Sequence, residues 1–361
     1  MAHEIIGNQP VIDLLENCLM MAREHGMQHA AVSMVAYPNK AYFAASGEVQ
    51  LEVNQHESVT KLAERLQKNV DNGKPPPEDE SLGAEYACYN AVNGSYGFDF
   101  ISWLIDAEMR RRSFGAPAPL RVGFWCGHSQ ELDSNREKRA HWLVHVFRPA
   151  LQLIGAVEDE RAIYGHRSGT LTRKPITTSA LAGETVPKLI ADRRDVGYRT
   201  SLNPRVTITL REAHYWPHRN SNVAVWHRFA IKLKQEGHRV VFIRDTALAH
   251  EGIAGFETDP LASIDLIHRM RVYETAKINL FVANGPCELA LFSDRPWLCF
   301  TPVEDEDSGY RPNTPKFWEE DHGIAVGEQF PWSGPAQRIV WEYPTYEALC
   351  NAWDAVKGLI D

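Results

Sequence analysis

Residues 204–222, PRVTITLREAHYWPHRNSN, decide the fold of this chain. The run 206–210 is short, rich in β-branched residues and bounded by polar ones, which predicts a buried parallel strand. Several capping residues end at Asn222, and apolar residues then recur at helical spacing up to Gly237. A second strand is predicted at 239–243. This order of strand, helix and strand is typical of half of a nucleotide-binding α/β domain.

The loop between this strand and this helix has the chemistry to bind phosphate. Ligands of open parallel sheets bind beyond the carboxyl ends of the strands, where helix N-termini attract anions. Arg211 follows the strand directly, and Arg219, Asn220 and Ser221 precede the helix. We expect these four residues to bind the phosphates of a ligand. Trp216, in the same polar loop, is a candidate for stacking on that ligand.

The same pattern returns further along the chain. Its predicted elements are a strand at 278–283, the turn Asn284-Gly285-Pro286, a short helix at 287–292 and a strand at 297–301. Gly285 lets a ligand approach the backbone closely, and Pro286 suits the first position of a helix. Glu288 would lie one turn from the ligand. We therefore add Asn284, Gly285, Pro286 and Glu288 to the expected phosphate-binding residues.

Composition narrows the classes of function. The chain has 361 residues, enough for two domains, and a formal net charge of −9, so a small anionic ligand is expected rather than nucleic acid. Its six cysteines have no CxxC spacing and indicate neither a zinc site nor a disulfide framework. His214 and His218 have the spacing of helical metal ligands, but Pro217 between them disfavours a helix. With no leader and no apolar run of about 20 residues, we expect a cytoplasmic protein without a membrane span.

A proline run followed by acidic residues, at 74–80, marks a domain boundary. We expect a small α/β N-terminal appendage at 1–73, a linker at 74–84, and Rossmann-like domains at 85–200 and 201–361. The appendage is predicted to hold helices at 11–25 and 58–70 and strands at 30–35 and 40–45. The first Rossmann-like domain is predicted to hold strands at 86–92, 120–126 and 162–164 and helices at 98–112 and 136–153. The fold class is thus α/β, with two doubly wound domains that face a cleft. A C-terminal tail is predicted to add a strand at 338–341 and a helix at 346–360. This last helix is expected to pack back on the first domain.

Two turns resemble those of the GT-B glycosyltransferases. Asn93-Gly94-Ser95-Tyr96-Gly97-Phe98-Asp99 is similar to the acceptor-side turn of heptosyltransferase-like enzymes, and Asn284-Gly285-Pro286-Cys287-Glu288-Leu289-Ala290 to their donor-side turn and helix. Leu210-Arg211-Glu212 resembles the strand-Arg motif of bacterial fucosyltransferase-like proteins. The resemblance covers about 85–361. The donor-side turn differs in having Asn284 where those relatives usually carry Ser or Thr, and in lacking a His on the helix.

The resemblance implies a transferase with a nucleotide-sugar donor in the C-terminal domain and an acceptor hydroxyl, on a bacterial-type glycan or a small molecule, in the N-terminal domain. It implies no metal and no other cofactor, because Arg211, Arg219 and helix amides could neutralise the departing diphosphate. Asp99 matches the place of a carboxylate base, and Glu288 that of a carboxylate holding the ribose hydroxyls. His128, after the strand at 120–126, is a second candidate base or phosphate contact.

Each of these residues also has a purely structural interpretation. Asp99 could simply favour the dipole at the start of its helix. Arg211 could form an ion pair with Glu212 or Asp245, and residues 219–221 could do no more than begin a helix. Most of the aromatic residues at helical spacing are expected in the core.

Two other functions stay open. A nucleotide-sugar epimerase or hydrolase would use the same cleft with water in place of the acceptor. A non-catalytic nucleotide- or sugar-binding module, assembled through its appendage, would bind nucleotide without turnover. The turn at 93–99 lacks a complete G-x-G-x-x-G, which disfavours a redox enzyme.

Overall fold

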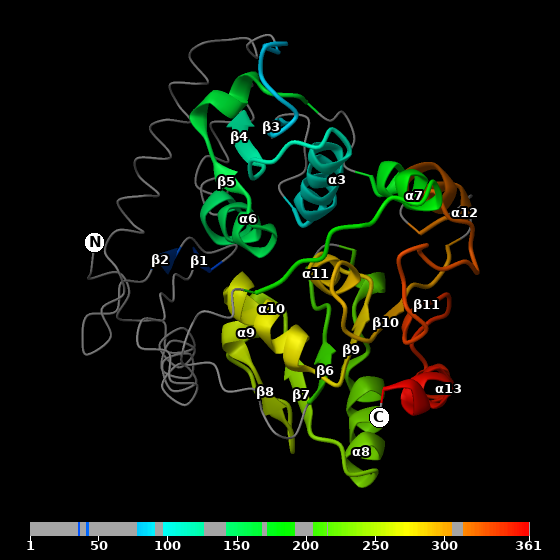
Figure 1. Ribbon diagram of the computed structural model, residues 1–361. Helices are drawn as coiled ribbons and strands as arrows, with labels where there is room; N and C mark the ends of the chain where they lie inside the picture. Colours follow the sequence, from blue (N-terminus) through cyan, green and yellow to red (C-terminus); the bar gives the residue numbers. More distant parts are fainter. Residues whose placement is uncertain are drawn as a thin grey trace. The chain divides into compact units, whose positions relative to one another are not determined.

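The computed structural model describes residues 78–90, 97–125, 142–167, 172–191, 205–214, 216–304 and 313–360 (Figure 1). It also describes two short antiparallel strands, β1 (Val35–Ala36) and β2 (Ala41–Tyr42). The described residues form two compact units of α/β structure. Unit 1 contains β1, β2 and the described residues of 191–304 and 333–360, and unit 2 contains those of 78–190 and 313–332. The predicted helices at 11–25 and 58–70 lie outside the described residues.

Unit 1 is built on a six-stranded parallel sheet. Its strands are β6 (Val206–Thr209), β7 (Val240–Ile243), β8 (Glu257–Thr258), β9 (Ile278–Val282), β10 (Trp297–Phe300) and β11 (Gln337–Val340). Their order in the sheet is β11-β10-β9-β6-β7-β8. The chain therefore runs outward from β6 to β8, returns to β9 beside β6, and runs outward again on the other side. This is the strand order of the nucleotide-binding doubly wound fold, with its switch point between β6 and β9.

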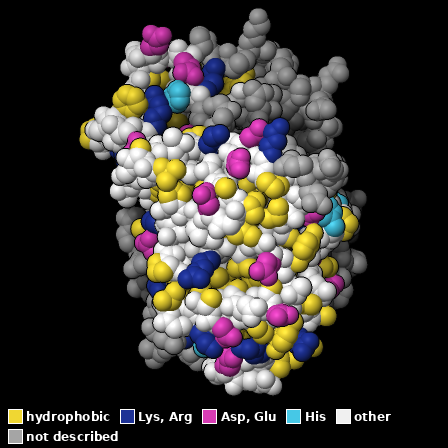
Figure 2. Space-filling view, turned by 90° about the vertical axis from the view of Figure 1, so that its right-hand side faces the viewer, with side chains coloured by type: hydrophobic (Ala, Val, Ile, Leu, Met, Phe, Trp, Pro, Cys, Tyr) yellow, Lys and Arg dark blue, Asp and Glu magenta, His cyan; other side chains and the backbone are white. Residues whose placement is uncertain are grey.

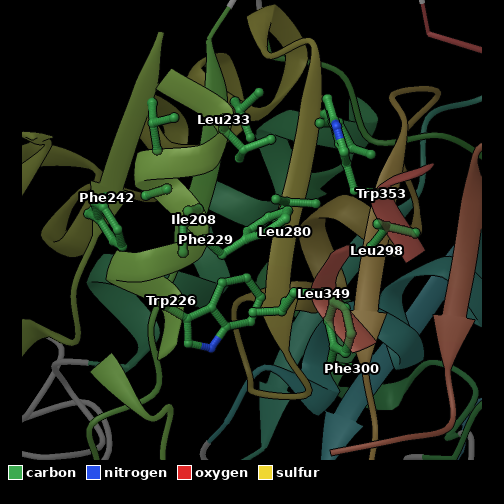
Figure 3. Packing of buried hydrophobic residues seen from close by; sticks show 14 of the residues in the cluster. Ile208, Trp226, Phe229, Leu233, Phe242, Leu280, Leu298, Phe300, Leu349 and Trp353 are labelled. Atoms are coloured by element: carbon green, nitrogen blue, oxygen red, sulfur yellow. The ribbon is translucent and has the colours of Figure 1, made fainter. Parts of the chain in front are cut away.

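One face of this sheet carries the main core of unit 1. Figure 3 shows how the helices α8 (Val223–Gln235) and α13 (Tyr346–Val356) pack on it. Every second strand residue faces these helices, as the two-residue period of a strand requires. The cluster includes Ile208, Phe242, Leu280, Leu298 and Phe300 from the strands, Trp226, Phe229 and Leu233 from α8, and Leu349 and Trp353 from α13. The closing helix α13 thus belongs to the core of unit 1.

The opposite face buries polar side chains that satisfy one another. Thr207 Oγ1 donates to Asn279 Oδ1 at 2.7 Å, across the β6–β9 pair. Asn279 Nδ2 donates to the Tyr273 carbonyl at 3.1 Å, and the Tyr273 and Thr209 hydroxyls lie 2.9 Å apart. Tyr273 belongs to α10 (Leu266–Thr275), so α10 covers this second face. Both faces are buried, which explains why 206–210 has the mostly apolar composition of a central parallel strand.

The core predicts a large stability difference between two Ala substitutions. Leu280 is 1 % exposed at the centre of β9, whereas Ile231 is 41 % exposed on α8. Leu280→Ala should lower the free energy of unfolding by about 2–5 kcal/mol, because it leaves a cavity. Ile231→Ala should change it by no more than about 0.5 kcal/mol. Denaturant midpoints measure both, and equal losses would contradict the placement of β9 in the core.

Unit 2 contains a three-stranded parallel sheet in the order β3-β4-β5. Its elements are β3 (Tyr86–Asn90), α3 (Asp99–Ser113), β4 (Arg121–Trp125), the π-helix η1 (Leu143–Phe147), α6 (Arg148–Ile154), β5 (Val157–Glu158), α7 (Lys174–Leu181), α12 (Pro315–Phe317) and the π-helix η6 (Trp318–His322). Tyr89 is 1 % exposed and meets four rings edge-on, those of Phe100 at 4.8 Å, Trp103 at 5.0 Å, Phe147 at 5.3 Å and Phe124 at 6.4 Å. These aromatic contacts fix α3 and η1 on β3.

The strand predicted at 162–164 is wrong. These residues belong to the 3-10 helix η2 (Glu160–Tyr164), and the third strand position is taken by β5. Asp159 causes the difference, because its side chain accepts a hydrogen bond from the Arg161 amide and begins the helix. Ala162 is fully buried, and the backbone of η2 lies so close to Gly123 of β4 that a Cβ there would collide with it.

Five further short helices complete the described elements. They are η3 (Pro217–Arg219), η4 (Thr246–Leu248), α9 (Pro260–Ile264), α11 (Cys287–Leu291) and η7 (Lys357–Leu359). No helix among the described residues has the length and apolarity needed to cross a membrane. Figure 2 shows a face on which acidic and basic side chains are interspersed with apolar ones. The described part of that face carries no extended basic surface of the kind that binds nucleic acid.

Candidate functional site

Two loops of unit 1 meet at the switch point of the sheet. One follows β6 and runs from Leu210 to the start of α8, and the other follows β9 at Ala283. Arg219 Nη2 in the first loop donates a hydrogen bond to the Ala283 carbonyl in the second, at 3.1 Å. The structure therefore brings together the two stretches that the sequence assigned separately to phosphate. In Figure 1, β6 and β9 lie side by side, as their pairing requires.

Two hydrogen bonds between Arg211 and Ser221 close the base of the first loop. The Arg211 amide donates to Ser221 Oγ at 2.9 Å, and the Ser221 amide donates to the Arg211 carbonyl at 2.8 Å. Ser221 is 7 % exposed, so its hydroxyl closes the base of the loop. This double contact fixes the start of α8 directly beyond the end of β6. Asn222 caps the helix by accepting a hydrogen bond from the Val225 amide, as the capping pattern predicted.

Arg211 holds this loop from inside. Its side chain is 4 % exposed in the folded chain, and its Nη1 donates to the Trp216 carbonyl at 3.0 Å and to Asn220 Oδ1. Asn220 in turn bonds both backbone groups of Ala213, donating to the carbonyl at 2.8 Å and accepting from the amide at 3.1 Å. The guanidinium charge is thus fixed beneath the loop at the carboxyl edge of the sheet.

A neighbouring ion pair involves Glu212, one of the two partners considered for Arg211. Arg244, at the end of β7, forms a bidentate pair with Glu212, with Nη2 to Oε1 at 2.6 Å and Nε to Oε2 at 2.9 Å. Asp245 Oδ2 accepts a hydrogen bond from the Glu212 amide at 2.6 Å. Burial raises the pKa of Asp245, although the Glu212 amide and two arginines oppose that rise. These contacts join the carboxyl ends of β6 and β7 into one rigid edge.

Sequence reasoning did not select Arg244 for this edge, and it named Asp245 only as a possible ion-pair partner of Arg211. One signal could have found them, because the pair Arg244-Asp245 follows β7 just as Arg211-Glu212 follows β6. Charged residues at the carboxyl ends of adjacent parallel strands are expected to meet.

Trp216 adopts an unusual backbone conformation in this loop. Its φ is 50° and its ψ is 60°, in the left-handed region that bulky residues rarely adopt. Its carbonyl accepts hydrogen bonds from the Arg219 amide at 3.0 Å and from Arg211. Its side chain is 47 % exposed. The loop thus presents a large aromatic group at its surface.

The second loop is the turn after β9. Asn284 Oδ1 accepts a hydrogen bond from the Cys287 amide at 3.2 Å, which begins α11. Gly285 is exposed and Pro286 is the residue before the first turn of α11. Glu288 is 3 % exposed, within the first turn. The ribose role expected of Glu288 stays a prediction.

The acceptor-side residues belong to unit 2 and are partly described. Asp99 is the exposed first residue of α3. The residue at the N-cap of this helix is Phe98, whose side chain cannot form a capping hydrogen bond. Gly97 precedes it at the edge of the described segment. Asn93, Gly94, Ser95 and His128 lie outside the described residues, so their expected roles stay predictions.

No group of three or more His, Cys, Asp or Glu side chains in the described ranges is arranged to hold a metal ion. His214 and His218 are both exposed, and Pro217 begins the 3-10 helix η3 between them. Metal independence stays a prediction.

A third carboxylate at this edge, that of Asp259, has a structural role. Asp259 follows β8, is fully buried, and accepts hydrogen bonds from the Ala262 amide at 2.9 Å and from His268 Nε2 at 3.1 Å. Burial opposes its ionisation, but His268 and the Ala262 amide outweigh it, so its pKa lies below the usual 3.8. The carboxylate therefore stabilises the fold above its unfolded pKa, and this stabilisation is lost as the pH falls through the lower folded pKa.

Asp259→Asn tests this assignment through pH. It should lower the free energy of unfolding by about 1–3 kcal/mol at neutral pH, because the charged carboxylate that contacts His268 is lost while Asn still caps α9. The difference from wild type should shrink as the pH falls below the usual Asp value. Asp265→Asn is the matched control, since Asp265 caps α10 through the His268 amide. A pH-independent loss in Asp259→Asn would contradict the charged role.

Comparisons with known proteins identify no family. No family model and no curated protein matches this chain. Among solved structures it is similar to the iron-containing dodecameric glycosyltransferase TibC of enterotoxigenic E. coli, at 16% identity and a TM-score of 0.42, over 76% of this chain and 75% of that one. A TibC heptosyltransferase structure in complex with ADP-D-beta-D-heptose gives 14% identity and a TM-score of 0.43, over 80% of this chain and 77% of that one.

A third similar structure is a family 9 glycosyl transferase from Veillonella parvula, at 10% identity and a TM-score of 0.34, over 73% of this chain and 77% of that one. All three structures are of proteins named as glycosyltransferases, and two of them are of TibC. Their TM-scores are 0.43 or less, so the function proposed below rests on the residues of this chain.

Proposed function

We propose that this chain is a glycosyltransferase that moves a sugar from a nucleotide-sugar donor to a hydroxyl acceptor. The observation that carries the proposal is the meeting of two loops at the β6–β9 switch point, joined by the hydrogen bond from Arg219 to Ala283. Doubly wound sheets bind nucleotides at this place. The proposal includes a cytoplasmic location and a donor held by unit 1.

The charges at the switch point suit a diphosphate. Arg211 and Arg219 both belong to the loop after β6, and α8 begins directly behind them with the positive end of its dipole. A departing nucleoside diphosphate gains negative charge as the sugar leaves. Fixed positive groups aimed at that charge stabilise the transition state without having to reorganise. In this proposal the two arginines and the helix amides do this work without a metal ion.

The acceptor side is assigned to unit 2. Asp99, exposed at the start of α3, is proposed to take the proton from the acceptor hydroxyl as that oxygen attacks the anomeric carbon. His128 is the second candidate for this proton transfer. The resemblance of the turn at 93–99 to an acceptor-side turn supports the assignment. The acceptor is a hydroxyl on a glycan or on a small molecule.

The experiment that tests the proposal measures nucleoside diphosphate release from a panel of nucleotide sugars in EDTA. The panel holds UDP-, GDP- and ADP-sugars, including the ADP-heptose named for one TibC structure. Release that depends on an added hydroxyl acceptor supports the transferase. Release without acceptor indicates a hydrolase, and binding without release indicates a non-catalytic module. Absence of both binding and release would remove the proposal.

A further inference from the structure

Trp216 combines three features that a loop residue seldom has together. It is bulky, it lies in the left-handed region with φ at 50°, and it directly precedes a proline. Residues before proline favour extended conformations, and left-handed backbone in a residue with a side chain is costly. Such a conformation persists only where the surroundings impose it. The contacts of its carbonyl show what imposes it.

The Trp216 carbonyl accepts hydrogen bonds from two residues of the loop, one before it and one after it in the sequence. The Arg219 amide donates to it at 3.0 Å, which closes η3, and Arg211 Nη1 donates to it at 3.0 Å from the end of β6. Arg211 also donates to Asn220 Oδ1. The buried guanidinium therefore spans the loop and fixes the turn between Trp216 and Asn220.

The effect of this arrangement is to hold the indole out of the core. Trp216 is 47 % exposed, whereas Trp226, Trp297 and Trp353 in the same unit are fully buried. A left-handed backbone and a buried arginine thus act together at a residue whose aromatic side chain is exposed. The loop that presents the indole is also the one that reaches Ala283 across the switch point.

We propose that Trp216 is the stacking surface for the nucleobase of the bound nucleotide, and that Arg211 is the positioning residue that presents it. The inference rests on the proposed function, since it requires a nucleotide at the switch point. A planar base covers the flat face of an indole, and every base offers such a face. The stacking contact should therefore strengthen binding of any nucleotide with little choice between bases.

The test compares ADP with inorganic pyrophosphate, each titrated calorimetrically into the full chain in EDTA. Trp216→Ala should weaken ADP binding about 5- to 150-fold, the range measured for loss of one base–aromatic stack, and leave pyrophosphate binding unchanged. Trp216→Phe should keep ADP affinity within about threefold, because Phe retains an aromatic face. Tryptophan fluorescence should be quenched by ADP in wild type but not in Trp216→Phe.

Other outcomes overturn the inference in distinguishable ways. Equal losses for ADP and pyrophosphate in Trp216→Ala would make Trp216 a brace of the loop and not a stacking surface. Unchanged ADP binding in Trp216→Ala would show that Trp216 does not stack on the nucleobase. The indole would then contact another part of the ligand, such as the donor sugar that ADP lacks, and the proposed function would stand. UDP and GDP are titrated into wild type in the same way, and if it binds none of ADP, UDP and GDP, the proposed function fails and this inference fails with it.

Discussion

Replacing Arg211 by Ala should weaken nucleoside diphosphate binding by about 10- to 100-fold. The substitution removes the buried positive charge at the carboxyl end of β6 and leaves the Trp216 carbonyl and Asn220 Oδ1 without that donor. Hydrogen bonds that involve a charged group contribute about 1.5–3 kcal/mol each, and about 1.4 kcal/mol corresponds to tenfold in affinity. Pyrophosphate binding should fall as well, which separates this variant from Trp216→Ala. Calorimetric titration in EDTA measures both ligands.

Arg239→Ala is the matched control for Arg211→Ala. Arg239 stands at the amino end of β7, where its ion pair with Glu257 is partly exposed, with Nη2 to Oε2 at 2.6 Å. Exposed pairs contribute about 0–1 kcal/mol, so this variant should bind nucleotide like wild type. Denaturant midpoints of both variants show whether they are folded. Unchanged nucleotide affinity in a folded Arg211→Ala would remove Arg211 from the site.

Asp99→Asn should lower turnover by about 10²- to 10⁴-fold while the affinity for the donor stays unchanged. A general base contributes a rate factor of that size, and the amide of Asn cannot accept the acceptor's proton. Asp99 belongs to unit 2, whereas the residues proposed to bind the donor belong to unit 1. A selective loss of kcat is therefore expected. Steady-state rates, with donor binding measured separately, test this.

The exposure of Asp99 makes Asp99→Asn a substitution with little effect on stability. The side chain is exposed at the first turn of α3, so loss of its favourable interaction with the helix dipole should cost only about 0.3–1 kcal/mol. Glu184→Gln, which neutralises another exposed carboxylate of unit 2, should leave turnover unchanged. Full activity in Asp99→Asn would show that Asp99 is not the base and only favours the start of α3. His128 would then be the remaining candidate base.

The central elements of unit 1 could be predicted because their residue pattern is local. Strands β6, β7, β9 and β10 are runs of apolar and β-branched residues between polar boundaries, and α8 begins at a capping Asn and ends before Gly237. The two-residue strands β5 and β8 are too short to leave such a pattern. The residues 162–164 do have the apolar pattern of a strand, but the prediction was wrong because Asp159 caps a 3-10 helix that includes them.

The sequence was enough to choose the strand ends where a ligand site is expected, but not to predict which residues contact one another there. The rule that ligands bind beyond strand ends selected Arg211 and Asn284. The bond from Arg219 to Ala283 depends on β9 returning beside β6, which local pattern does not encode. The same holds for the pairing of Glu212 with Arg244, which arises from two strands that are adjacent in the sheet.

The most direct test of the switch-point site is hydrogen exchange of the full chain with and without UDP, GDP and ADP, in EDTA. A ligand that binds the native state slows the exchange of the amides it orders. With at least one of the three nucleotides, protection should appear at 211–222 and 283–288, on both sides of the β6–β9 switch point. Protection confined to other segments, or no protection with any of the three, would contradict a nucleotide site between β6 and β9.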